Sequence, residues 1–80
     1  MRSKRITDED VLAAIVEVAG DGYCRLHDLV GAMAKRTHAD RRSAIYRAVG
    51  GGLLIQRRGP DGRQYVAVAS EGWRRLRAVA

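Results

Sequence analysis

The chain has few of the residues that mark several protein classes. Its single cysteine, Cys24, excludes a disulfide within the chain and is typical of a reducing cytosol. One proline and 46% hydrophobic residues are unlike the composition of disordered chains. No apolar run approaches the ~18 residues of a membrane span, and the basic start MRSKRITDED leads into no apolar stretch. We therefore expect one cytoplasmic domain over residues 1–80, with no membrane partner.

Acidic residues are scarce in the second half of the chain. Residues 1–40 carry six Lys or Arg and seven Asp or Glu, which leaves a net charge of −1. Residues 41–80 carry nine Arg and two acidic residues, which leaves +7. One-sided basicity of this kind is the electrostatic footprint of nucleic-acid binders. An arginine surface that only interacts with solvent is the alternative interpretation.

The sequence also lacks the patterns of common catalytic and metal sites. No Ser/His/Asp set converges on a plausible pocket, and no Gly-rich phosphate loop follows a strand, so we expect no enzyme and no cofactor. Cys24 and His27 have a short ligand spacing, and His38 follows, but a zinc site needs a fourth ligand that the sequence does not offer. We therefore expect no metal site.

Helix signals dominate the first half of the chain. Thr7 and Asp10 form a predicted capping box, and apolar residues then recur at helical spacing over residues 8–19. The sequence GDG ends this helix. A short extended piece at 23–26 precedes a second helix, HDLVGAMAKR.

The second half combines helices with a hairpin. Thr37 and Asp40 form a second predicted capping box, which opens a helix over residues 38–49 that three glycines end. The runs LLIQRR and QYVAVA are strand-like, and GPDG between them is typical of a hairpin turn. Ser70 is a suitable cap for a last helix, EGWRRLRAVA.

The expected elements form a mostly helical α+β domain. The segments RRSAIYRAV, GLLIQRR and GRQYVAVASEGWRRL resemble winged helix-turn-helix DNA-binding domains, and the last is similar to the ending of bacterial MarR- and PadR-type regulators. The resemblance covers roughly residues 7–76. It implies the order α-β-α-α-β-β-α, with the third helix in the major groove and the hairpin as a wing beside it.

The third helix carries the expected recognition residues. An α-helix fits the major groove, where arginine forms two hydrogen bonds with guanine. Rotation of about 100° per residue places Ser43 and Arg47 opposite the apolar face, with Tyr46 at the edge. We expect Ser43 and Arg47 to contact base edges, and Arg41 or Arg42 to contact phosphate. An ordinary amphipathic helix is the alternative.

The expected wing carries Arg57, Arg58, Arg63 and Gln64. Arginine at a wing suits both phosphate and a narrow minor groove. Neighbouring strand residues point to opposite faces, so Arg57 and Arg58 are not expected to face the duplex together. A charged edge that prevents strand-to-strand aggregation is the alternative, and both roles can coexist.

These patterns predict sequence-specific binding of double-stranded DNA by a small transcriptional regulator or DNA-architectural protein, associated with the nucleoid. A winged-helix protein-interaction module is one alternative, because fold does not fix function. An RNA binder is another, although the few aromatic residues are scattered along the sequence. Trp73 and Leu76 form an apolar stripe that either closes the core or joins a second copy, which makes a homodimer a candidate.

Overall fold

The computed structural model describes residues 6–33 and 38–79, and its elements follow the expected order. The helices are α1 (Asp8–Ala19), α2 (Leu26–Ala32), α3 (His38–Gly50) and α4 (Ser70–Val79). The strands are β1 (Cys24–Arg25), β2 (Leu54–Arg58) and β3 (Gln64–Val68). The prediction of a mostly helical α+β domain is confirmed.

The first helix begins at the predicted capping box. The Thr7 Oγ1 atom accepts a hydrogen bond from the Asp10 backbone N–H at 3.1 Å, and Asp10 Oδ2 accepts one from the Thr7 N–H at 2.9 Å. Two backbone donors that the helix itself leaves without partners are thereby satisfied. Thr37, which belongs to the second predicted box, lies outside the described residues.

The triple glycine ends α3 and turns the chain into β2. Gly52 has a φ of 81°, a left-handed conformation that glycine adopts without a steric penalty. The N–H of Gly52 donates to the Val49 carbonyl at 3.1 Å, and the N–H of Leu53 donates to the Ala48 carbonyl at 3.0 Å. This pair of bonds is the Schellman motif, and it fixes the direction in which the hairpin leaves the helix.

The three strands form one antiparallel sheet in the order β1-β3-β2. Leu54 lies opposite Val68, and Val66 lies opposite both Cys24 and Gln56. Directly paired residues share a face, so these side chains form the inner face of the sheet, which is buried near β1 and the base of the hairpin. Val66, which is 1% exposed, lies at its centre.

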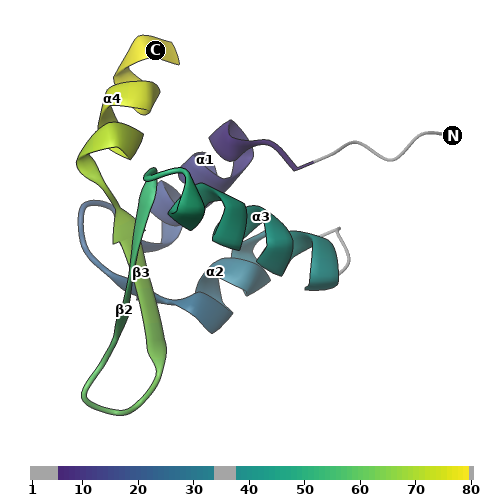
Figure 1. The fold of residues 1–80 in the computed structure, drawn as a ribbon, viewed down its shortest axis with the longest axis vertical. Coiled ribbons are helices and arrows are strands. Elements are labelled where there is room, and N and C mark those ends of the chain that lie inside the picture. Colours follow the sequence, from purple (N-terminus) through teal and green to yellow (C-terminus); the bar gives the residue numbers. More distant parts are fainter. Residues whose placement is uncertain (1–5, 34–37, 80) are drawn as a thin grey trace, which may run out of the picture.

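Three helices cover the inner face of the sheet. Figure 1 shows α1, α2 and α3 on one side of the hairpin, whose tip lies at the opposite end of the molecule from α4. The fully buried core side chains are Val11, Leu12, Ile15, Leu29, Ile45 and Val66. Trp73 and Leu76 of α4 are half-buried against this core. In the described parts of the chain, no helix is long and apolar enough to cross a membrane.

Candidate nucleic-acid interface

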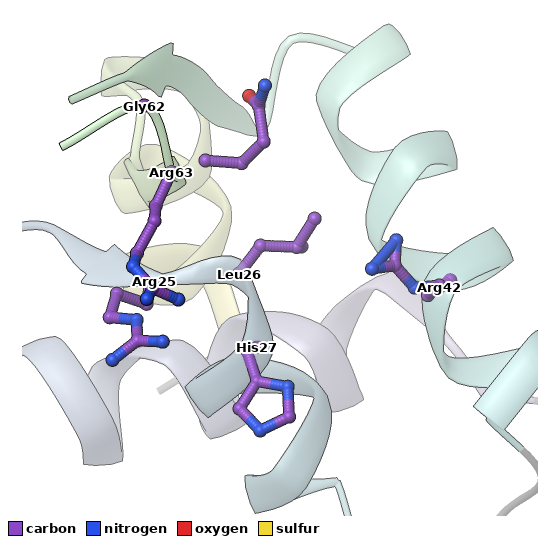
Figure 2. Close-up of a pocket in the computed structure, with 7 residues that line it drawn as sticks. Arg25, Leu26, His27, Arg42, Gly62 and Arg63 are labelled. Carbon is purple, nitrogen blue, oxygen red and sulfur yellow. The ribbon is translucent and has the colours of Figure 1, made fainter.

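A basic hollow of about 270 Å³ lies where β1, α2, α3 and the hairpin tip meet. Figure 2 shows Arg25 and Arg63 on one side of it, Arg42 of α3 on the other, and His27 between them. The residues that line the hollow are Arg25, Leu26, His27, Arg42, Gly62, Arg63 and Gln64. None of these described lining residues is acidic, and although Asp61 lies 3.7 Å from the Arg63 Nε atom, the three arginines give the hollow a net positive charge that suits an anion.

The hairpin tip is held in one shape around Asp61. Asp61 Oδ1 accepts a hydrogen bond from the Arg63 N–H at 3.0 Å, and Oδ2 accepts one from the Tyr65 hydroxyl at 2.8 Å. The Arg63 Nε atom lies 3.7 Å from Oδ2. Tyr65 also packs its ring against the Cα of Gly59, where a Cβ atom would lie only 2.8 Å from the Tyr65 Cδ1 atom. Arg63 therefore reaches the hollow from an ordered turn.

These contacts shift the acidity of the two side chains at the tip. The hydrogen bond from the Arg63 backbone, followed by the bond from the Tyr65 hydroxyl, lowers the pKa of Asp61. The hydrogen bond to the Asp61 carboxylate raises the pKa of Tyr65. Both shifts favour the charge states in which the tip is bonded.

The part of α3 outside the core includes Arg42, Ser43 and Tyr46. Arg42 lines the hollow, and its Nη1 atom donates to the Tyr46 hydroxyl at 3.1 Å, one turn further along the helix. Tyr46 is 44% exposed, and Ser43 is also exposed. The opposite side of α3 is buried through Ala44, Ile45 and Ala48. The predicted apolar face of this helix is confirmed at Ile45 and Ala48.

Two other arginines of α3 are engaged by the protein itself. Arg41 Nη1 donates to the Val30 carbonyl, near the end of α2, at 2.8 Å. Arg47 Nη2 donates to the Ile6 carbonyl at 2.6 Å, and Arg47 Nε lies 3.9 Å from Asp8 Oδ1 at the start of α1. The sequence places Arg47 opposite the apolar face, and its side chain is half-exposed, but its guanidinium group is directed to α1.

The two neighbouring arginines of β2 lie on opposite faces of the sheet. Arg58 pairs with Gln64, which lines the hollow, so Arg58 shares the hollow's side of the hairpin. Arg57 lies on the other face, where its guanidinium carbon is 5.6 Å from the centre of the Tyr23 ring. This distance is that of a cation–π contact. The expected alternation of Arg57 and Arg58 is confirmed.

Arg25 and His27 are the lining residues that the sequence did not indicate. Both flank the start of α2, and β1 brings them to the hollow by pairing Arg25 with Tyr65 of β3. The extended piece around residue 24 is recognisable in the sequence, but its residues do not indicate which strand it pairs with. Within the described residues, no three His, Cys, Asp or Glu side chains converge as they would around a metal ion.

No protein-family model, curated protein or solved structure matches this chain.

Proposed function

We propose that this chain is a winged helix-turn-helix domain that binds double-stranded DNA, as a small transcriptional regulator or DNA-architectural protein. Ser43 and Tyr46 of α3 read base edges in the major groove. Arg42, at the rim of the hollow, binds a phosphate beside them. The β2–β3 hairpin serves as the wing, and Arg63 anchors it on the adjacent backbone or in the minor groove.

The observation that carries this proposal is the shared hollow. Arg42 comes from the expected recognition helix and Arg63 from the expected wing, yet both line one concave surface that Arg25 and His27 complete. Phosphate oxygens accept hydrogen bonds from guanidinium groups in a forked geometry that arginine matches. When a DNA backbone lies along the hollow, its negative phosphates lie between these arginines and offset the repulsion of their like charges.

Arg41 and Arg47 take a different role in this proposal from the one their sequence positions indicate. Their guanidinium groups donate to main-chain carbonyls of Val30 and Ile6. They fix α3 against α2 and against the start of α1, and so hold Ser43 and Tyr46 at the required angle. Base reading by Arg47 would break its bond to Ile6, so we assign it to positioning.

Two copies bound side by side are part of the same proposal. Trp73 and Leu76 pack against the core but stay half-exposed on α4, and Val18 of α1 is 41% exposed. These apolar surfaces suit contact with a second copy. The two α3 helices of such a homodimer would lie about 34 Å apart, one turn of DNA. A protein of this kind is expected in the cytoplasm, with the nucleoid.

Selection of bound sequences from a pool of random duplexes tests the proposal. We expect enrichment of a defined site, and a palindromic site if two copies bind. Footprinting on the enriched site would show protection of one groove face per copy. Failure to enrich any site contradicts sequence-specific reading. Stronger competition by single-stranded RNA than by duplex DNA would favour the RNA-binding alternative.

A further inference from the structure

The outer face of the sheet, away from α1, α2 and α3, presents an apolar surface beside a positive charge. Tyr23 is 45% exposed and Ile55 is 43% exposed, two of the most exposed large hydrophobic side chains in the described residues. Arg57 lies on the same face, next to Tyr23, and the strand register places Tyr65 and Arg25 beside it. This surface, formed by Tyr23, Ile55, Ala67 and Arg57, is called the outer patch below.

The register explains the shape of the outer patch. Ala67 pairs with Ile55 on one side. On its other side, Tyr23 precedes Cys24, whose partner is Val66, so Tyr23 lies beside Ala67. Ala67 between them is only 6% exposed, so the exposed apolar surface of this face comes from Tyr23 and Ile55.

An open strand edge borders the outer patch. The sheet order β1-β3-β2 places β2 at the edge, and within the described residues no strand pairs with its outer side. Such an edge presents main-chain N–H and C=O groups to which another extended segment can bond. Ile55 and Arg57 point to the outer face from this same strand, two residues apart.

We propose that the outer patch and the edge of β2 bind an extended segment of another protein that carries an apolar residue and a carboxylate two positions apart. The segment adds to β2 as a further strand. Its apolar side chain lies beside Ile55 on the outer face. Its carboxylate pairs with Arg57, because residues two apart along a strand lie about 6.6–6.8 Å apart on one face. This inference goes beyond the proposed DNA binding, which uses the hollow.

Charge and ring geometry favour this partner over two others. A second copy would bring its own Arg57 and Arg58 to the same edge, where like charges repel. A single-stranded nucleic acid needs free aromatic faces on which bases stack. The Tyr23 ring already has Arg57 over it, and the Tyr65 ring packs against Gly59 with its hydroxyl bonded to Asp61. A strand that carries a carboxylate is attracted by Arg57 and needs no free aromatic ring.

The test uses a short synthetic peptide built from the repeat Val-Thr-Glu-Thr, in which valine and glutamate lie two positions apart on the same face of a strand. A matched peptide carries glutamine in place of glutamate. Each is titrated into the isotope-labelled protein while the backbone amide signals are followed by NMR. We expect saturable shifts in residues 54–58 and 65–68 with the glutamate peptide, and weaker binding of the glutamine peptide.

Two variants on neighbouring positions of β2 locate the binding face. Ile55→Thr keeps a β-branched residue on an exposed position and should weaken peptide binding about tenfold. Arg58→Gln, on the opposite face, should leave peptide binding unchanged. Ile55→Thr should also leave duplex DNA binding unchanged, so failure of this inference is distinguishable from failure of the proposed function. A circular dichroism spectrum confirms that each variant is folded.

Several results would overturn the inference. Peptide shifts centred on His27 and Arg42 would mean that the hollow binds the peptide by charge alone. Equal binding of the two peptides would remove the role of Arg57. Single-stranded DNA shifting the outer patch more tightly than the peptide would assign the face to nucleic acid. Self-association that Ile55→Thr abolishes would assign it to a second copy.

Discussion

Two groups of arginines in this molecule differ in where their guanidinium groups end. Arg41 and Arg47, here called the held arginines, donate to main-chain carbonyls of other elements. Arg25, Arg42 and Arg63, here called the hollow arginines, line the hollow instead, with side-chain contacts from Arg42 to Tyr46 and from Arg63 to Asp61. The arginines of this chain therefore have two uses, and the hollow draws one of its three, Arg25, from the first half of the sequence. One group joins helices, and the other forms a surface suited to phosphate.

The largest expected effect is on DNA binding by a hollow arginine. Arg42→Ala removes a charged contact to phosphate at the edge of α3, and we expect duplex affinity to fall by about 1.5–3 kcal/mol on all sequences alike. Titration of a labelled duplex at fixed salt measures this. Arg74→Ala is the matched control, because Arg74 is 72% exposed on α4 and pairs only at the surface with Glu71. If both variants lost the same amount of duplex affinity, the net charge of the protein would explain the effect and the position of Arg42 would not matter.

The second expected effect is on folding stability, where replacing a held arginine should cost more than replacing a hollow arginine. Arg47→Ala removes the 2.6 Å bond to the Ile6 carbonyl and the neighbouring contact with Asp8. We expect the free energy of unfolding to fall by about 1–2 kcal/mol. Urea denaturation measures this change. Arg42→Ala in the same assay should lose less, because its bond to the Tyr46 hydroxyl is exposed whereas the bond from Arg47 to Ile6 is partly buried. Identical stabilities of the two variants would contradict the division into two groups.

A smaller effect is expected where the hairpin tip positions Arg63. Tyr65→Phe removes the hydroxyl that donates to Asp61 at 2.8 Å and leaves the ring in place. We expect faster hydrogen exchange at the Arg63 N–H, which is bonded to the same carboxylate, and a two- to tenfold loss of duplex affinity. Unchanged exchange at Arg63 would show that the turn alone orders the tip.

The smallest effect concerns pH and the contact between the two ends of the described chain. Arg75 Nη1 donates to Glu9 Oε2 at 2.7 Å, and this bond lowers the pKa of Glu9 below its ordinary value of 4.5. A depressed folded-state pKa contributes stability above the unfolded value, and that contribution disappears as the pH falls through the folded value. Glu9→Gln should therefore unfold slightly more easily than the original protein at pH 7.

The same pair of proteins should converge in acid. As the pH falls through the lowered pKa of Glu9, the carboxylate of the original protein becomes protonated, so thermal unfolding of the two should approach one midpoint. Arg77→Gln is a control on the same helix that should keep its difference from the original protein constant over this range. A gap between Glu9→Gln and the original protein that persists at low pH would mean that the glutamate side chain stabilises α1 by packing.

The order of elements was predictable because each boundary depends on local chemistry. Thr7 and Asp10 form their capping box within one helical turn. The three glycines end α3 through bonds to its own last carbonyls. The alternation of Arg57 and Arg58 follows from strand geometry alone. None of these features requires knowledge of a distant partner.

The separation of the two arginine groups was not predictable in this way. A helical projection places Arg47 opposite Ile45, but it contains no information about the start of α1, whose carbonyl at Ile6 the side chain reaches. The role of Arg25 depends on the pairing of β1 with β3, which lie about 40 residues apart in the sequence. Both contacts join residues that are far apart in the sequence, and a single sequence does not show which distant residues meet in the fold.

The salt dependence of duplex binding tests directly whether the hollow arginines bind DNA phosphates. If Arg25, Arg42, Arg58 and Arg63 each neutralise one phosphate, log K against log salt should have a slope of about −3.6. Replacing the three hollow arginines together by glutamine should reduce the slope to about −0.9. Replacing both held arginines by lysine, in a variant shown to be folded, should leave it near its original value. A slope that stays unchanged in the triple variant would contradict the assignment of the hollow to DNA.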